Sequence, residues 1–246
     1  MHVRGMSRLL SFRRPRRIVP TQMAYELWAP TYPATAHNPL MRAEQQIVEL
    51  LLRDLRPGRA LDVGTGSGRY LPVLAATGAR AVVGLDFSRA MLAQASRRWP
   101  RIRGDARRLP FRRGAFDIVN ASLMAGDVDD LAAWLREISS ALARGGHLLY
   151  SDFHPSWARR GWRRTFQTSD GRTLDLPFAA HSIADHLSAL DAAGLEVLAI
   201  REPHLADDGD PAVAAFRRRW GNAPVVVVFH ATKNGPVSPP NRARVP

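Results

Sequence analysis

A glycine-rich segment carries the strongest chemical signal in this sequence. Residues 61–68 read Leu-Asp-Val-Gly-Thr-Gly-Ser-Gly and lie between an apolar run and an amphipathic stretch. Glycines permit a tight turn and let a ligand approach the backbone, and a helix that begins there presents free N–H groups. The segment predicts a ligand-binding turn between a strand and a helix. A turn kept only for packing is the alternative.

An acidic residue supports the ligand-binding interpretation. Asp86 ends the next apolar run, 22 residues after Gly64, where a carboxylate can take both hydroxyls of a ribose. The glycine spacing is G-x-G-x-G, with Asp62 two residues before the first glycine, whereas a nicotinamide-binding turn has the spacing G-x-G-x-x-G. The two elements together predict a site for an adenosine-type cofactor.

With these motifs the chain resembles the class I S-adenosylmethionine-dependent methyltransferases, in particular the small-molecule branch of quinone-biosynthesis and malonyl-carrier-protein enzymes. The resemblance covers about residues 25–232 and implies S-adenosyl-L-methionine as the cofactor. It assigns the following residues to cofactor binding: Tyr25, Asp62, Gly64, Thr65, Gly66, Gly68, Asp86, Phe87, Asp105, Ala106 and Asn120.

The resemblance also implies what each part of the site does. The glycine loop packs on the methionine part of the cofactor, Asp86 holds the ribose, and Phe87 lies against the adenosine. Residues 104–106 meet the adenine, and residues 120–123 end the fourth strand beside the sulfonium. The segment 25–32 resembles the family's entry segment, in which a tyrosine folds over the cofactor. Tyr25 and Tyr32 can equally form a hydrophobic staple beneath the first helix.

The acceptor side has weaker signals. His154 follows the fifth strand, at the sheet end where ligands bind, and can serve as a base for a hydroxyl acceptor or as a structural turn residue. Arg163, Arg164 and Arg172 can hold an anionic acceptor by forked hydrogen bonds, or form a solvated face. We take His154 as the catalytic candidate. The acceptor-binding candidates are Tyr32, Arg164 and Arg172.

The favoured function is methyl transfer to a small-molecule acceptor, with oxygen as the expected target and nitrogen and carbon open. One alternative is an RNA methyltransferase, which the net charge of +13 suggests. Residues 120–123 read Asn-Ala-Ser-Leu, however, and not the N-P-P-aromatic segment that resembles enzymes acting on the exocyclic amines of nucleic-acid bases. The other alternative is a cofactor-binding subunit without turnover.

The elements that must position these residues follow from periodicity. Residues 60–63, 81–85, 116–121, 147–151, 195–200 and 225–232 are predicted strands. Helices are predicted from Pro39, with Leu40, Ala43, Ile47, Leu50, Leu51 and Leu55 on one face, and over residues 129–143 and 182–193. The alternation predicts an α/β fold with a Rossmann-like, doubly wound, mostly parallel sheet and a C-terminal antiparallel strand.

An insertion is expected after the fifth strand, over about residues 155–180. Asp170-Gly171 is a two-residue hairpin signal, and Trp157, Trp162 and Phe166 would exclude water from the site, so the insertion is interpreted as a lid. The methyltransferase domain is predicted over residues 22–233. A basic arm over residues 1–21 and a tail over residues 234–246 are expected to be disordered.

Composition excludes several classes of site. The chain has no cysteine, so disulfides, iron–sulfur clusters and thiolate zinc sites are excluded. Asp127, Asp129 and Asp130 could suggest magnesium, but the last two are better interpreted as helix-start acids, and no metal is expected. Nine of the thirteen net charges come from the six arginines before Glu26 and from Lys233, Arg242 and Arg244 at the other end of the sequence, so nucleic acid is not the expected partner. We expect a cytoplasmic protein without a membrane span or signal peptide.

Overall fold

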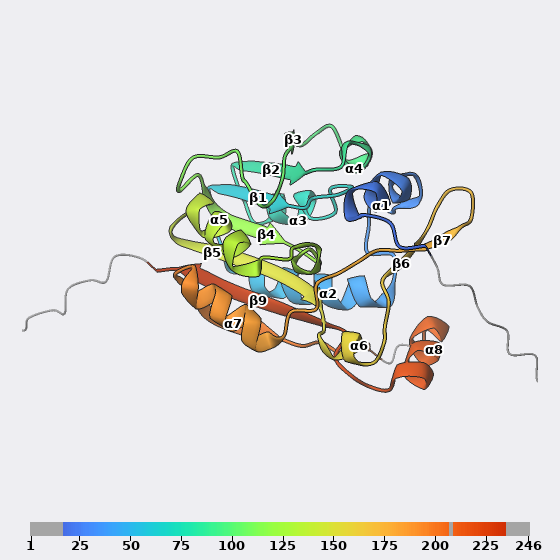
Figure 1. Cartoon of the computed structure of the whole chain (residues 1–246). Helices are drawn as coiled ribbons and strands as arrows, with labels where there is room; N and C mark the ends of the chain where they lie inside the picture. The colour runs from blue at the N-terminus through green and yellow to red at the C-terminus, as the bar shows by residue number, and fades with distance from the viewer. Residues whose placement is uncertain (1–16, 207–208, 235–246) are drawn as a thin grey trace, which may run out of the picture.

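Seven strands form one mixed sheet with the order β3-β2-β1-β4-β5-β9-β8 (Figure 1). The first five in the chain run parallel, and β9 is antiparallel to both β5 and β8, which confirms the predicted fold class. The strands are β1 Arg59–Val63, β2 Ala81–Asp86, β3 Arg101–Arg103, β4 Phe116–Ala121, β5 Leu142–Phe153, β8 Leu195–Arg201 and β9 Val226–Lys233. Residues 17–206 and 209–234 are described by this computed structural model.

Helices cover both faces of the sheet, and each face has its own apolar cluster. α5 (Leu131–Ala141) and α7 (Ile183–Ala192) pack on one face, and α2 (Pro39–Leu52) and α3 (Leu71–Ala76) pack on the other (Figure 1). The short helix α4 (Arg89–Gln94) follows β2. None of the helices in residues 17–206 and 209–234 is long and apolar enough to cross a membrane.

Helix α2 begins where its capping signal predicts. Asn38 accepts a hydrogen bond from the N–H of Met41 at 2.9 Å, and Pro39 occupies the first turn. The predicted buried face was wrong in part, because the side chain of Leu50 is 48% exposed while Glu44 is fully buried. The helix is rotated about its axis relative to the apolar pattern, since Glu44 has polar partners inside the fold, described below.

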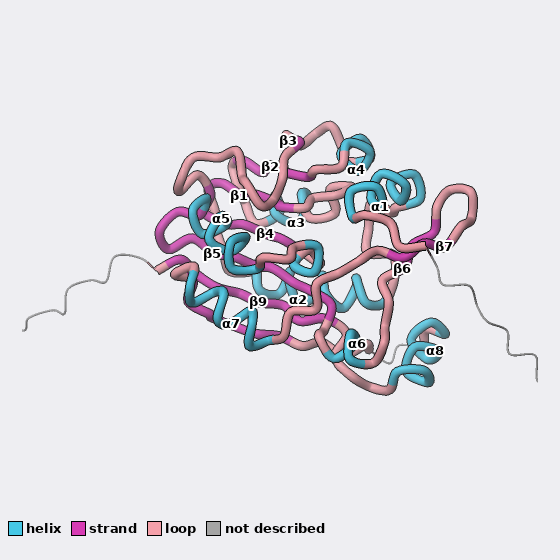
Figure 2. The backbone as a smooth tube through the Cα atoms, viewed as in Figure 1, coloured by secondary structure: helices cyan, strands magenta, loops and turns pink. Residues whose placement is uncertain are grey.

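The insertion after β5 is a β-hairpin, as predicted (Figure 2). It contains α6 (Ser156–Arg159), β6 (Thr165–Gln167) and β7 (Thr173–Asp175). Its turn is longer than the predicted two residues, because the N–H of Thr168 donates to the carbonyl of Arg172 at 3.0 Å and leaves three residues between them. Gly171 has φ +80°, which suits a three-residue loop with glycine in the left-handed region.

The N-terminal part of the chain packs against this hairpin and forms a cap with it. The N–H of Val19 donates to the carbonyl of Asp175 at 3.0 Å. Val19, Ala24 of α1 (Thr21–Trp28), Phe166 and Leu174 share one apolar cluster. The expected arm therefore ends earlier than residue 21. Its residues 1–16, and residues 235–246 of the expected tail, lie outside the described residues.

A helix that the sequence interpretation missed lies between β8 and β9. This helix, α8, spans Pro211–Trp220, and the side chain of Asp210 caps it by accepting from the N–H of Ala212 at 2.8 Å. The Asp-Pro pair is a helix-start signal that could have been recognised. Val213 is buried, and Phe216 packs on Trp157 of α6 with ring centroids 4.9 Å apart. α8 therefore places apolar side chains beside the carboxyl ends of the strands.

Candidate active site

A cavity of about 940 Å³ opens at the carboxyl ends of the parallel strands, between the sheet and the cap. The glycine-rich loop after β1 and the residues after β2, β3 and β4 form one side of its lining. α1 and the hairpin contribute Tyr25, Trp28, Trp162 and Arg164. This end of an open α/β sheet is where such folds bind ligands.

The loop after β1 brings the backbone to the cavity as predicted. Gly64 has φ +69°, and a Cβ there would lie 2.9 Å from the side chain of Met124, so both conformation and space require glycine. The N–H of Gly66 donates to Asp86 Oδ2 at 2.8 Å. Gly64, Thr65 and Gly66 line the cavity. Gly68 does not, and a Cβ at Gly68 would lie 3.0 Å from the Cβ of Ala95, so this glycine serves helix packing.

Asp86 ends β2 with its carboxylate at the cavity. Oδ1 accepts from the N–H of Ser88 at 2.8 Å, Oδ2 accepts from Gly66, and only 6% of the residue is exposed. Burial raises the pKa of Asp86 to about 6. Each oxygen keeps a second lone pair, and the carboxylate forms no ion pair within the described residues. The group therefore suits two hydroxyl donors on one ligand.

Asp62 and Asn120 form a buried pair beneath the loop. The amide of Asn120 donates to Asp62 Oδ1 at 2.8 Å, and burial raises the pKa of Asp62 to about 6. Asp62 lines the cavity, whereas Asn120 does not. The structure thus assigns Asn120 to holding the carboxylate of Asp62, in place of the predicted cofactor contact.

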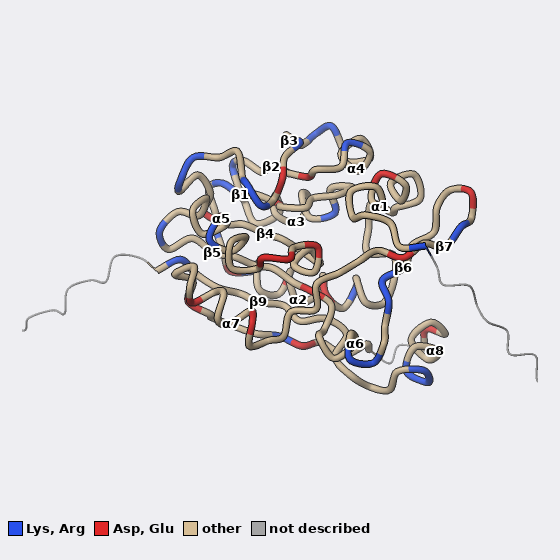
Figure 3. Tube along the Cα trace, viewed as in Figure 1, with Lys and Arg blue, Asp and Glu red and all other residues tan. Residues whose placement is uncertain are grey.

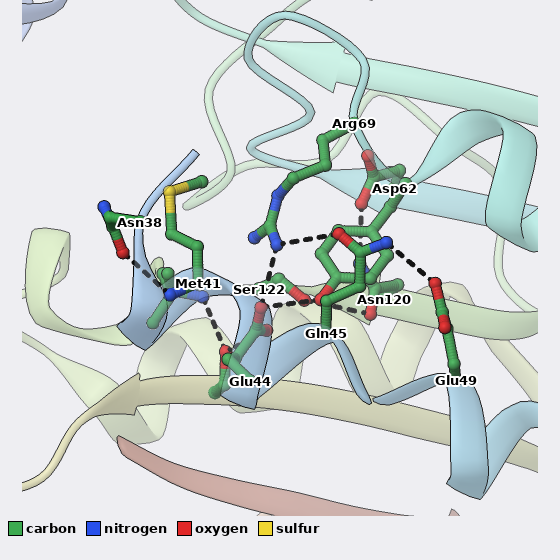
Figure 4. A network of polar contacts seen from close by, with 12 residues as sticks. Asn38, Met41, Glu44, Gln45, Glu49, Asp62, Arg69, Asn120 and Ser122 are labelled. Atoms are coloured by element: carbon green, nitrogen blue, oxygen red, sulfur yellow. Dashed lines mark hydrogen bonds and ion pairs between the residues drawn. The ribbon is translucent and has the colours of Figure 1, made fainter. Parts of the chain in front are cut away.

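A second buried network was missed at the sequence level (Figure 4). Glu44 of α2 accepts from Arg69 Nη1 at 3.0 Å, from the hydroxyl of Tyr70 at 2.6 Å and from the hydroxyl of Ser151 at 2.8 Å. Arg69 lines the cavity directly after the glycine loop. The available signal was an acid on an otherwise apolar stripe of α2, followed in the chain by an arginine at a ligand-binding turn.

The same network holds an unusual backbone position at the end of β4. Leu123 has φ +54°, which is uncommon for a residue with a branched side chain. Its N–H donates to the hydroxyl of Ser151 at 2.7 Å, and Ser151 donates to Glu44. Leu123 lines the cavity. α2 thereby stabilises the strained peptide where the resemblance places the sulfonium.

The residues predicted to meet the adenosine follow β2 and β3. Phe87, Asp105 and Ala106 line the cavity together. The carboxylate of Asp105 accepts from Arg107 Nε at 3.0 Å and Nη2 at 2.7 Å. These hydrogen bonds lower the pKa of Asp105. Asp105 is exposed at the rim, and Ala106 is buried behind it.

Three side chains from distant parts of the chain connect the cap to the sheet. The hydroxyl of Tyr25 donates to Asp127 Oδ2 at 2.6 Å, and Arg164 Nη1 donates to Asp127 Oδ1 at 2.6 Å. Arg164 also donates to the hydroxyl of Tyr25. Tyr25, Asp127 and Arg164 all line the cavity, as does Tyr32, whose ring packs edge-on against Trp28. The cap is therefore tied to η2 (Ala125–Asp127), which follows β4.

Two predicted acceptor-side residues are not brought to the cavity. His154 Nδ1 lies 2.7 Å from the hydroxyl of Ser156, and its Nε2 lies 2.8 Å from Glu202 Oε1, so the ring is occupied elsewhere. Arg172 is exposed at the hairpin turn and donates from Nε to Asp170 at 2.7 Å. Neither belongs to the lining.

Two of the three lid aromatics also lie outside the cavity. Trp157 packs on α8, and Phe166 packs inside the cap, where its ring stacks on Trp28. Of the three aromatic residues expected to exclude water, only Trp162 lines the cavity.

Comparisons with known proteins agree with the geometry of the part of the cavity formed by the glycine loop, Asp86 and residues 104–106, which we call the cofactor half. Residues 61–150 match the family model for a methyltransferase domain. A demethylmenaquinone methyltransferase of Mycolicibacterium gilvum is 40% identical over 113 residues, which cover 46% of this chain and 47% of the relative. A malonyl-[acyl-carrier protein] O-methyltransferase of Legionella pneumophila is 34% identical over 108 residues, 41% of this chain and 38% of the relative. The chain thus spans less than half the length of these curated relatives.

The fold is also found in solved structures. An S-adenosylmethionine-dependent methyltransferase from Mesorhizobium loti aligns with a TM-score of 0.63 over 78% of this chain and 99% of its own, at 23% identity. This likeness shows a common fold.

Proposed function

Because this chain belongs to the class I S-adenosylmethionine-dependent methyltransferases, we propose that it transfers a methyl group from S-adenosylmethionine to an oxygen atom of a small-molecule acceptor. The observation that carries the proposal is the carboxylate of Asp86, held by the N–H groups of Gly66 and Ser88 with free acceptor capacity toward the cavity. Bound S-adenosylmethionine supplies an electrophilic methyl group on a sulfonium.

The residues of the cofactor half fit the groups that this cofactor presents. Asp86 would accept from the two ribose hydroxyls, and Phe87 and Ala106 would flank the adenine. The methionine end carries an ammonium and a carboxylate. Asp62 and Arg69 line the cavity on either side of the glycine loop, with opposite charges suited to those two groups.

On the acceptor side, the chain has to orient the nucleophile and, for a hydroxyl, accept its proton. Asp127 lines the cavity and is fixed by Tyr25 and Arg164, so we assign it the role of proton acceptor in place of His154. The cap would exclude water while the acceptor is aligned with the methyl group. The similarity to the Legionella malonyl-[acyl-carrier protein] O-methyltransferase supports oxygen as the target.

Transfer of a ¹³C-labelled methyl group into a metabolite extract tests this proposal. We expect label in small molecules, with the carbon chemical shift of a methoxy group or a methyl ester. An N-methyl or C-methyl signal would contradict oxygen as the target, while leaving methyl transfer in place. Label in RNA would favour the nucleic-acid alternative, and cofactor binding without any label would favour the subunit without turnover.

A further inference from the structure

The half of the cavity away from the cofactor residues has a different chemical character. It lies toward β5, β9 and β8, and its lining includes Phe153, Trp162, Leu205 and Phe216, with Met41 of α2 beside them. These side chains come from the end of β5, the hairpin, the segment after β8 and α8. These residues all lie outside residues 61–150, the part of the chain that matches the family model.

Three aromatic rings line this part of the cavity, those of Phe153, Trp162 and Phe216. Phe153 and Trp162 have ring centroids 4.7 Å apart, and Trp162 contacts Phe178 edge-on at 5.5 Å. Phe216 of α8 is supported from behind by Trp157, whose ring lies outside the cavity at a centroid distance of 4.9 Å. Arg42 of α2 pairs with Asp210 at 2.7 Å and anchors the beginning of α8. Rigid aromatic surfaces of this kind bind flat apolar ligands by burying their faces.

The charges on this side are already compensated within the protein. Arg164 pairs with Asp127 at 2.6 Å, and both side chains are 8% exposed. Arg163 pairs with Asp175 of β7. An anionic acceptor placed against Arg164 would bring a second negative charge beside Asp127 in a largely buried site, which is unfavourable. The arrangement therefore argues against the anion-binding role that the sequence suggested for Arg164.

We propose that the acceptor is an uncharged molecule whose methylated hydroxyl is carried on a flat, apolar ring body, and that α8 forms the wall that selects it. The ring body lies against Phe153, Trp162 and Phe216, with its hydroxyl directed to Asp127. The hydroxyl oxygen forms the new bond to the methyl carbon, the carbon–sulfur bond breaks toward sulfur, and the proton passes to Asp127. This inference rests on the proposed function.

A matched pair of probes tests the acceptor class on the full chain. With S-adenosylhomocysteine saturating, calorimetry compares 2-naphthol with 2-naphthoate at neutral pH, where the first is neutral and the second is an anion. We expect 2-naphthol to bind at least about tenfold more tightly. Equal or tighter binding of 2-naphthoate, or no binding of either probe, overturns the proposal. Failure of S-adenosylhomocysteine itself to bind would contradict the proposed function instead.

Substitutions on α8 test the wall. Phe216→Asp places a charge in the apolar lining and should weaken 2-naphthol binding at least about tenfold, with S-adenosylhomocysteine affinity unchanged. Ala215→Asp is the matched control, because Ala215 is the exposed neighbour on the same helix and should change neither affinity. Phe216→Leu keeps the lining apolar and should lose less than about threefold. If Phe216→Asp folds and binds 2-naphthol normally, α8 is not the wall. If Phe216→Asp does not fold, Phe216→Trp replaces it, because the larger ring narrows the cavity beside α8. Unchanged 2-naphthol affinity in Phe216→Trp would then contradict the proposal.

Discussion

At the scale of single residues, the site depends on acids that are buried yet face a cavity. Asp62 and Asp86 both have a pKa raised to about 6 by burial, and both are held by neutral hydrogen-bond donors. Neither carboxylate forms an ion pair with another residue that the structure describes, so a ligand with hydroxyl or ammonium donors stabilises it strongly. The site is thus electrostatically prepared for the donor.

Removal of one of these acids should weaken binding of the methyl donor while the protein still folds. Asp86→Ala eliminates hydrogen bonds to a charged acceptor, and we expect affinity for S-adenosylhomocysteine to fall on the order of a hundredfold. Calorimetry measures this, and circular dichroism checks that the variant folds. Asp170→Ala, at an exposed hairpin acid, is the control and should bind normally. Unchanged affinity in a folded Asp86→Ala protein would remove this residue from the site.

The raised pKa values also predict a pH dependence of donor binding. Hydroxyl donors prefer the ionised carboxylate, and Asp86 becomes protonated as the pH falls through about 6. Affinity for S-adenosylhomocysteine should therefore drop by about tenfold between pH 7 and pH 5 from Asp86 alone. Calorimetry at several pH values checks the slope. In Asp86→Asn this part of the dependence should disappear, and a slope of the opposite sign would exclude the assignment.

At the scale of elements, α2 acts as a support for the site through Glu44. Its carboxylate joins Arg69 and Tyr70 to Ser151 of β5, and through Ser151 it holds the peptide of Leu123. The helix therefore links the loop after β1 to the ends of β4 and β5. This explains why α2 turns a charged side chain inward and leaves Leu50 exposed.

The contribution of Glu44 should be measurable as a change in the free energy of unfolding. Glu44→Ala leaves Arg69 buried without its counter-charge, so the free energy of unfolding should fall by about 3 to 5 kcal/mol. Urea denaturation measures this. Glu49→Ala, at an exposed glutamate of the same helix, should change stability by less than about 0.5 kcal/mol. Equal effects of the two substitutions would show that the helix contributes only its apolar contacts.

At the scale of the whole molecule, positively charged residues are spread over the described part of the fold (Figure 3), in addition to those that the sequence places in its terminal segments. Residues 97–113 contain eight arginines and one aspartate, and they surround the edge strand β3. Arginines on an edge strand also discourage pairing with another sheet. The positive charge of the fold is therefore unevenly distributed, with a local excess near β3 that the net charge of the whole chain does not reveal.

Deletion of residues 1–16 and 235–246 should lower the net positive charge of the protein while leaving its fold and its cofactor site intact. These segments carry seven of the thirteen net positive charges, so the salt-dependent binding of nonspecific DNA should weaken and its salt slope should become shallower. S-adenosylhomocysteine affinity should stay within about twofold. Extending the N-terminal deletion through residue 20 should lower the melting temperature, because it removes Val19 from the cap. An unchanged melting temperature would show that this contact does not stabilise the cap.

The sequence by itself determined the part of the molecule that depends on neighbours along the chain. The glycine loop, Asp62 and Asp86 belong to successive strand–turn units, and their spacing reflects local backbone geometry and hydrogen-bond chemistry. The order of the six predicted strands and of α2, α5 and α7 followed from periodicity for the same reason, since burial on a sheet sets the pattern of each element separately. The short edge strand β3 and the helix α8 were not predicted.

Only the tertiary structure decided which distant side chains meet. Tyr25, Asp127 and Arg164 come together across 139 residues of chain, and Glu44 reaches Ser151 across 107. His154, which sequence placed at the site, is instead engaged by Glu202, 48 residues away. A local pattern records what a residue type can do. Which partner it finds depends on where the cap, α2 and the segment after β8 are packed, because hydrogen bonds and ion pairs act only over a few ångströms.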